Sequence, residues 1–315
     1  MYRYILRRLL LAVPTILGAT LIVFFVMRVA PGDIVDVIAG EGSIPPAQQA
    51  AIRDKLGLSD PIPVQYLEWV WGLARLQVGN SLITDRPILP DVEDRVVVTA
   101  ELTIGAIVLS LLIAIPLGTI SALKQDSPID YVVRVISIGG LSLPSFWVAT
   151  VLLIGFSRWL GWIPPIQYHS LMDDPWSNLR QMLLPMLVLG YALSAIVSRL
   201  TRSSVIEVLR DDYIRTARAK GLSETTVVVR HGLRNALLPV ITVTGAQLGY
   251  LLGGTVIMET IFTIPGMGQY TLDAILRRDY PAVQFCVVFM AIAQILANLV
   301  TDVSYGVIDP RIRYR

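Results

Sequence analysis

Three polar residues, Gln294, Asn298 and Asp302, recur at four-residue steps in an otherwise apolar stretch near the end of the chain. This spacing places them on one face of a helix. Two amides and a carboxylate there could hydrogen-bond a polar solute, or they could bond to neighbouring helices. Polar residues within membrane spans are costly and often functional. Asp302, however, lies close to the end of the stretch, and we therefore favour bonding between helices.

A second candidate face combines Gln247 and Tyr250 with glycines at positions 245, 249 and 253. Small residues at every fourth position allow membrane helices to approach closely. Gln247 and Tyr250 could therefore line a pathway or lie at a seam between helices. We favour helix packing for the glycines.

Residues for catalysis and metal binding are scarce. The two histidines, His169 and His231, fall in different loops, and Cys286 is the single cysteine. This argues against a histidine-built metal centre and against an intramembrane hydrolase. The Gly-x-x-x-x-Gly-Lys-Ser/Thr phosphate loop is absent from the sequence, so this chain does not supply an ATP site.

The stretch from Ser203 to Leu238 is rich in basic residues and has helical periodicity. Its apolar residues recur at three- and four-residue steps and predict one helical face: Val205, Ile206, Leu209, Tyr213 and Ala217. Gly221 can adopt the left-handed conformation that ends a helix. Ser223 can cap a second short helix, with Glu224 in its first turn, which should end before Gly232.

This helix–glycine–helix projection could dock into a groove on another protein, or its basic residues could rest on anionic lipid headgroups. Acidic residues are interleaved among the basic ones, which weakens the lipid interpretation: Glu207, Asp211, Asp212 and Glu224. We therefore favour docking.

Composition places these segments in a membrane protein. Apolar residues make up 54% of the chain, charged residues only 16%, and the mean hydropathy is +0.63. Apolar stretches of about 20 residues, enough to cross a bilayer, predict an all-α bundle of six spans: Leu9–Met27, Leu102–Leu123, Val135–Ser157, Gln181–Ser198, Ala236–Met258 and Tyr280–Thr301. Pro116, Pro144 and Pro185 each remove a hydrogen bond within a span and predict a hinge or a fixed kink.

The basic residues predict the orientation. Sixteen Lys and Arg fall in the two termini, the loop with Lys124 and Arg134, and the loop 199–234, against eight in the other loops. Cytoplasmic loops hold the excess, so both termini are predicted to be cytoplasmic. Loop 30–99 is then extracytoplasmic. It should contain two short helices, Pro46–Leu58 and Val64–Leu76, the second with Tyr66, Trp69 and Trp71, which we expect to anchor a packed cap.

The run from Asp212 to Gly221, with Arg230–Pro239 after it, resembles the coupling loop of ABC importer permeases, in the form used by the dipeptide, oligopeptide and nickel branch. In the wider family this loop has the sequence pattern Glu-Ala-Ala, three residues and Gly. Here Arg215 and Thr216 replace Glu and the first Ala, whereas Ala217 and Gly221 fit. Further segments resemble the same branch, in particular its first paired permease: 7–33, 143–147, 161–165, 259–269, 278–281 and 309–314.

The resemblance implies a type I ABC importer permease fold and a role as the transmembrane subunit of an ATP-driven importer in the bacterial inner membrane. A homologous second permease would share the pathway, and an extracytoplasmic binding protein would deliver small peptides. Two cytoplasmic ATPase subunits, which would carry ATP and Mg²⁺, would dock on the coupling loop. The docking residues would be Tyr213, Arg215, Thr216, Ala217, Arg218, Ala219, Lys220, Gly221 and Leu222. No cofactor, metal or nucleic acid is expected on this chain, which would contact membrane lipid.

The expected organisation follows from these features. Residues 1–29 form the N-terminus and first span, 30–94 the extracytoplasmic loop, 95–305 the permease core with coupling loop 203–235, and 306–315 the tail. Nickel chelates, glutathione or a sugar remain alternative substrates. An ion-coupled secondary transporter is a distant alternative, because it needs an intramembrane carboxylate and usually an internal repeat. Asp302 is the only deep candidate.

Overall fold

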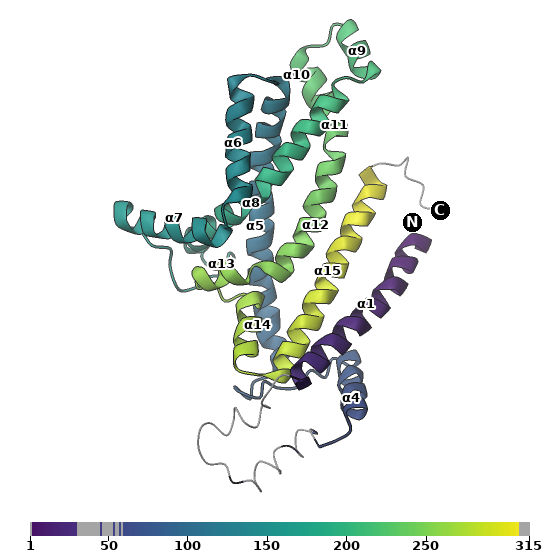
Figure 1. The fold of residues 1–315 in the computed structure, drawn as a ribbon, viewed down its shortest axis with the longest axis vertical. Coiled ribbons are helices and arrows are strands. Elements are labelled where there is room, and N and C mark those ends of the chain that lie inside the picture. The colour runs from purple at the N-terminus through teal and green to yellow at the C-terminus, as the bar shows by residue number, and fades with distance from the viewer. Residues whose placement is uncertain (1, 30–44, 46–52, 54–56, 58, 309–315) are drawn as a thin grey trace. The chain divides into compact units, whose positions relative to one another are not determined.

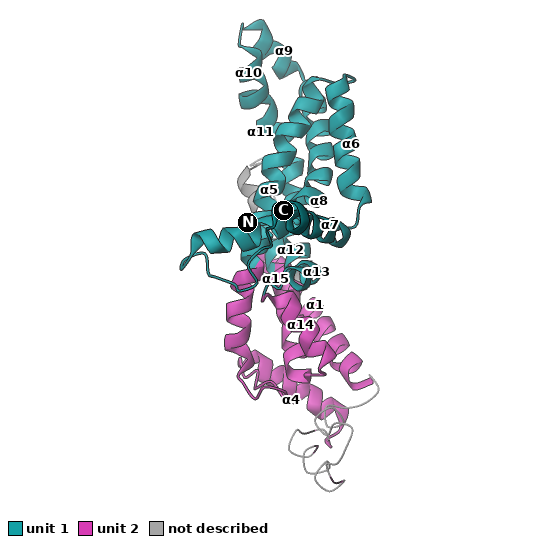
Figure 2. Cartoon of the chain, turned by 90° about the vertical axis from the view of Figure 1, so that its left-hand side faces the viewer, with its two compact units in different colours: residues 1, 100–264, 296–315 teal, residues 2–99, 265–295 magenta. Residues whose placement is uncertain are grey.

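The computed structural model describes residues 2–29, 45, 53, 57 and 59–308, and its regular elements in these residues are helices (Figure 1). An isolated bridge pairs Asn80 with Pro87. The chain divides into two compact units, coloured in Figure 2. In the described chain, unit 1 holds residues 100–264 and 296–308, and unit 2 holds residues 2–99 and 265–295.

Among the described residues, four helices are long and apolar enough to cross a membrane, and each contains a predicted span. They are α1 (Tyr2–Val29), α5 (Ile88–Leu123), α8 (Pro175–Val208) and α15 (Tyr280–Ile308). Two bent helix pairs raise the number to six if each pair counts as one span. The α-helical membrane fold is thus confirmed, and six spans require both bent pairs.

The third predicted span, Val135–Ser157, is wrong as a single helix. It is divided into α6 (Pro128–Ser142) and α7 (Ser145–Leu160), which meet at 102°. The break falls at Pro144, which lacks an N–H and disfavours helical geometry in the residue before it. Leu143 is accordingly extended, at φ −94° and ψ 127°. Pro116 and Pro185, by contrast, lie inside continuous helices.

The fifth predicted span, Ala236–Met258, is also interrupted. The chain bends by 48° between α11 (Leu233–Ala236) and α12 (Leu238–Gly254), and then breaks again at Thr255 before α13 (Val256–Ile261). Pro239 in the first turn of α12 has no N–H to continue the hydrogen-bond ladder of the preceding helix, which accounts for the first bend.

Glycines set the helix spacing within unit 1. A Cβ added at Gly190 in α8 would lie 2.8 Å from the carbonyl oxygen of Ala106 in α5. A Cβ at Gly118 in α5 would lie 2.6 Å from the Ser198 carbonyl oxygen in α8. Since real side chains do not fit at such distances, α5 and α8 are held together backbone to backbone.

The glycine face of α12 packs as predicted at one position. A Cβ on Gly245 would lie 2.2 Å from the Thr301 hydroxyl oxygen of α15, so these helices touch there, and Gly249 is buried. The contact between Gly245 and Thr301 lies within unit 1. Pro116 of α5 belongs to the same unit.

Unit 2 contains α1, α4 (Ile62–Ala74), the start of α5, α14 (Met267–Leu276) and the first half of α15. Helix α4 confirms the predicted helix over Val64–Leu76, whereas Pro46–Leu58 lies largely outside the described residues. Trp69 stacks on Phe24 of α1 at 5.8 Å between ring centroids. The Tyr66 hydroxyl lies 3.0 Å from that of Thr20. Two of the three predicted anchors therefore pack as a cap, and Trp71 is exposed.

Asp279 joins a loop to the start of α15. Its buried carboxylate accepts hydrogen bonds from the Ser81 hydroxyl at 2.5 Å and from the Leu82 N–H at 3.1 Å. The buried Ser81 hydroxyl and the partly buried Leu82 N–H are satisfied in this way, which fixes this loop within unit 2.

Replacing Asp279 with alanine should destabilise unit 2 by about 1–3 kcal/mol, because the Ser81 hydroxyl and Leu82 N–H lose their acceptor. Cys286, the only cysteine, is fully buried in the same unit. Its labelling by a thiol-reactive fluorophore during heating therefore reports opening of this unit. Labelling should begin at a lower temperature in Asp279→Ala. The exposed Asp273→Ala is the control, and equal labelling curves for the two variants would contradict this role.

Candidate functional site

The predicted projection is present at one end of unit 1 (Figure 2). It consists of α9 (Asp212–Ala219), a turn at Gly221, α10 (Glu224–Thr226) and a π-helical turn, η1 (Val227–Gly232). Helix α11 then leads back into α12. We call residues 212–232 the projection.

The apolar face predicted for one continuous helix is divided between two helices. Helix α8 ends at Val208, and the extended Asp211, at ψ 149°, separates it from α9. Val205 packs with Ala122 and Ala236, whereas Ile214 and Ala217 pack with Val227. The prediction of a single helix was wrong because the residues of the predicted apolar face pack into two separate clusters. Leu209 contacts both clusters.

The turn within the projection confirms the predicted roles of its small residues. Gly221 has φ +78°, and an added Cβ would meet open space. Its backbone conformation alone therefore favours glycine. The Ser223 hydroxyl caps α10 by accepting from the Thr226 N–H at 3.4 Å. The expectation that the second helix ends before Gly232 was wrong, since Gly232 has helical geometry and the helical path continues to Ala236.

A bidentate ion pair connects the two sides of the turn. Arg218 donates from Nε and Nη2 to the two carboxylate oxygens of Glu224, at 3.1 and 2.6 Å. The Glu224 carboxylate raises the pKa of Arg218 above its usual value. Because both side chains are about half exposed, the pair contributes only about 0–1 kcal/mol. Its bidentate geometry nevertheless links the last turn of α9 to the start of α10.

Eight of the nine predicted docking residues are on the surface of the projection, and Ala217 is not. Ala217 is buried against Ile214 and Val227, so it supports the surface from beneath. The Tyr213 ring is partly exposed, and its hydroxyl accepts from the Asn235 side-chain amide at 2.8 Å, tying α9 to α11. The projection thus has a rigid apolar base and an exposed polar surface.

A buried carboxylate that the sequence analysis did not identify lies near the end of α8, the helix that precedes the projection. Asp130, in the first turn of α6, is fully buried. It accepts from Arg202 of α8 at 2.9 and 2.8 Å and from Arg134 Nε at 3.1 Å. The Ser121 hydroxyl of α5 and the Asp126 N–H, the latter at 3.0 Å, complete the set.

This cluster, which we call the Asp130 node, joins α5, α6 and α8 close to the point where α8 leads into α9. Arg202 lies six residues before the end of α8, and α9 begins at Asp212. Any displacement of α9 that tilts this end of α8 would therefore act on α5 and α6 as well. The only local sequence signal is the spacing of Asp130 and Arg134, an i, i+4 pair.

The residues predicted to line a pathway or a helix seam are not gathered in one site. Gln247 is half-buried on α12, Tyr250 is 72% exposed, and Asn298 is exposed on α15. Asp302 and Gln294 are half-buried, and Gln294 belongs to unit 2 whereas the other four belong to unit 1. Their predicted roles stay predictions.

An open apolar groove of about 360 Å³ lies between α5, α12 and α15 in unit 1. Its lining includes Gly245 of the predicted glycine face but none of the five predicted pathway residues: Leu111, Ile115, Leu237, Val240, Ile241, Thr244, Gly245, Leu248, Ala297, Val300 and Thr301. Across the part of the chain that the structure describes, no group of three or more His, Cys, Asp or Glu could hold a metal ion.

Solved structures support the fold. The chain matches one from a crystal structure of an amino acid ABC transporter with histidines, with a TM-score of 0.52 and 13% identity over 71% of this chain and 94% of that one. It also matches one from inward-facing MetNI methionine ABC transporter, with a TM-score of 0.57 and 16% identity over 69% and 96%. At these identities the likeness concerns the fold alone, and it confirms the expected type I importer permease fold.

Sequence relatives match along the full length. A di/tripeptide transport system permease protein, DppB, of Pseudomonas aeruginosa is 42% identical over 100% of both chains. The dipeptide transport system permease protein DppB of Escherichia coli K12 is 39% identical, again over 100% of both. Family models for the inner membrane component of binding-protein-dependent transport systems match residues 114–314, and those for its N-terminal part match residues 1–103. The chain therefore belongs to the family of inner membrane permease components of binding-protein-dependent ABC importers.

Proposed function

We propose that this chain forms, together with a second homologous permease, the membrane pathway of an ATP-driven importer of di- and tripeptides. The observation that carries the proposal is the projection, an exposed helix–glycine–helix element on a rigid base, in a chain whose full-length relatives are named as dipeptide permeases. Because the relatives cover the whole chain, the likeness includes the coupling loop as well as the spans.

The proposed orientation places both termini and the projection in the cytoplasm. It is supported by the charge distribution, with sixteen basic residues on that side and eight in the loops on the other. The end of α1 that carries Arg28, and the start of α15, would then lie at the outer surface.

In this arrangement two ATPase subunits would bind the exposed residues of the projection, and ATP and Mg²⁺ would be bound by those subunits. The absence of a phosphate loop from this sequence agrees with such a division of labour. The apolar groove between α5, α12 and α15 offers a surface of suitable character for the second permease. A binding protein would deliver the substrate at the opposite, outer side.

Peptides are favoured over nickel chelates, glutathione or sugars by the names of the relatives. The test is ATP hydrolysis by the complete complex in nanodiscs, with the cognate binding protein and a panel of di- to pentapeptides, glutathione and chelated nickel. We expect di- and tripeptides to stimulate hydrolysis. Stimulation by another class alone would replace the substrate, and the absence of any co-purifying ATPase would overturn the importer assignment.

Replacing Gly221 with valine should separate docking from folding. Valine at φ +78° costs roughly 1–2 kcal/mol and distorts the turn, although no neighbour is close enough to clash. We expect normal membrane insertion but loss of ATPase co-purification or of stimulated hydrolysis.

Gly161→Val is a matched control for this experiment. Gly161 also follows a helix, has φ +60° and faces open space, but it lies outside the projection. The control should retain the ATPase subunits. Normal transport by Gly221→Val, or equal losses in both variants, would refute the docking role.

The Asp130 node should be needed for coupling rather than for docking. Breaking a buried ion pair costs about 3–5 kcal/mol, and less where the partners are partly exposed, as Arg134 and Arg202 are. In Asp130→Asn we therefore expect the ATPases to remain bound while peptide-stimulated hydrolysis falls by about fivefold or more, a modest coupling free energy. Asp126→Asn is the control, since Asp126 pairs with the same Arg134 but is exposed. Unchanged stimulation in Asp130→Asn would contradict this role.

A further inference from the structure

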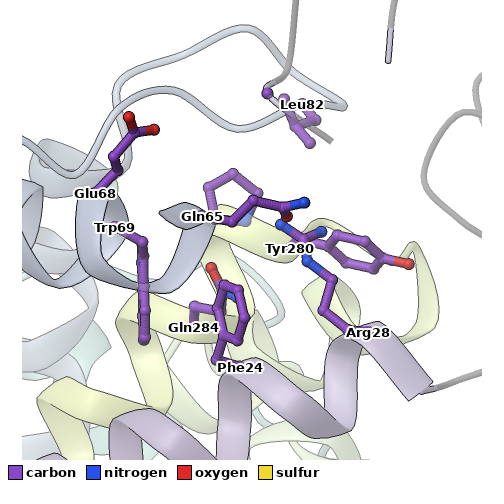
Figure 3. Close-up of a pocket in the computed structure, with 10 residues that line it drawn as sticks. Phe24, Arg28, Gln65, Glu68, Trp69, Leu82, Tyr280 and Gln284 are labelled. Atoms are coloured by element: carbon purple, nitrogen blue, oxygen red, sulfur yellow. The ribbon is translucent and has the colours of Figure 1, made fainter. Parts of the chain in front are cut away.

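A second pocket, within unit 2, has polar groups that the function proposed above does not use. It has a volume of about 230 Å³ and lies between the last turn of α1, helix α4 and the first turn of α15. Figure 3 shows Arg28, Gln284 and the aromatic rings of Phe24, Trp69 and Tyr280 around one space. The carboxylate of Glu68, at the edge, points away from it.

Gln284 supplies a buried hydrogen-bond donor. Its side chain is only 5% exposed, and its Nε2 atom has no hydrogen-bond acceptor among the described residues. Buried amide groups are almost always paired, since an unsatisfied one is costly. An acceptor atom of a ligand in this pocket would satisfy Gln284.

Arg28 supplies a positive charge next to this donor. Its guanidinium lies over the rings of Phe24 and Tyr280, at 5.1 and 5.6 Å from their centroids, and these contacts hold the group in place. The pocket also faces the first turn of α15, and the N-terminal end of a helix favours negative charge. The nearby Asp279 carboxylate is directed to Ser81 and Leu82 instead.

A planar guanidinium beside an amide N–H is a suitable arrangement for the two oxygens of a carboxylate. The remaining walls combine the apolar side chains of Phe24, Trp69 and Leu82 with the polar Gln65 and, at the edge, Glu68. Such walls favour a ligand whose carboxylate is attached to a small organic body. At about 230 Å³ the pocket is below the ~300–1,000 Å³ usual for drug-sized ligands, so one end of a short peptide fits better than a long chain.

We propose that Arg28 and Gln284, brought together at one aromatic-walled pocket, bind the terminal carboxylate of a short peptide. The identity of the ligand rests on the proposed function, because a peptide released at the outer surface would meet this pocket in the orientation given above. The site would receive the peptide before it enters the pathway between the permeases.

The test measures direct binding to the complete complex in nanodiscs, without binding protein or ATP. The probes are N-acetyl-dialanine and its C-terminal amide, and the signal is tryptophan fluorescence that disappears in Trp69→Phe, since Trp69 lines the pocket. We expect the amide, and the acid with Arg28→Gln, to bind about tenfold more weakly or worse, as for loss of a charge-assisted hydrogen bond. Arg75→Gln is the control, because Arg75 stacks on Trp71 outside this pocket.

A second variant distinguishes a loss of binding from a loss of folding. Gln284→Met removes the unpaired donor at similar volume, so it should weaken binding of the acid while leaving the thermal midpoint unchanged or higher. A lower midpoint would show that the amide is structural and would overturn the proposal.

Equal binding of acid and amide would also overturn it, and so would displacement of the acid by short-chain phosphatidylglycerol at lower concentrations, which would identify a lipid headgroup site. These outcomes are independent of the importer assignment. Peptide-stimulated hydrolysis with equal binding of acid and amide would refute the pocket alone. Selective binding of the acid without stimulation by any peptide would refute the proposed function alone.

Discussion

A fully buried carboxylate shared by two guanidinium groups holds one end of unit 1 together. Removing Asp130 from water is unfavourable unless its oxygens are fully paired. Arg134, Arg202 and Ser121 supply those partners from three different helices. The helix ends can separate only by leaving charge unpaired, so they move together or not at all. The position of α9, which directly follows α8, depends on this constraint.

The close approach of α5 and α8 makes the node possible. At Gly118 and Gly190 there is room for backbone contact only, and this proximity brings Ser121 and Arg202 within reach of one carboxylate. Unit 1 therefore combines two kinds of restraint: tight apolar contact along the helices and an ion pair at their end. The projection adds a third, the cluster of Ile214, Ala217 and Val227 beneath an exposed surface. A rigid base under exposed residues is what a force-transmitting contact requires.

The sequence predicted the helices better than their interruptions, for a physical reason. An apolar stretch of about 20 residues is specified locally, and so is the left-handed turn at Gly221. A proline is not decisive in the same way: Pro116 and Pro185 lie within continuous helices, whereas Pro144 divides one. Neighbouring helices determine which outcome is stable. The separation of α8 from α9 likewise depends on tertiary packing, because the apolar side chains of the two helices belong to two different clusters.

The residues that sequence reasoning missed are those whose partners are distant in the chain. Asp130 and Arg202 are 72 residues apart, and Ser81 and Asp279 are 198 apart. Both carboxylates have a similar set of donors, a serine hydroxyl and a backbone N–H, next to the start of a helix. In unit 1 two arginines add charge to that set, and the helices they join lead to the projection. In unit 2 Asp279 fixes a surface loop at the first turn of α15, the same turn that forms part of the Arg28 pocket. Each unit thus uses a buried acid to fix one helix: Asp130 fixes the end of α8 that precedes the projection, and Asp279 fixes a loop at the start of α15.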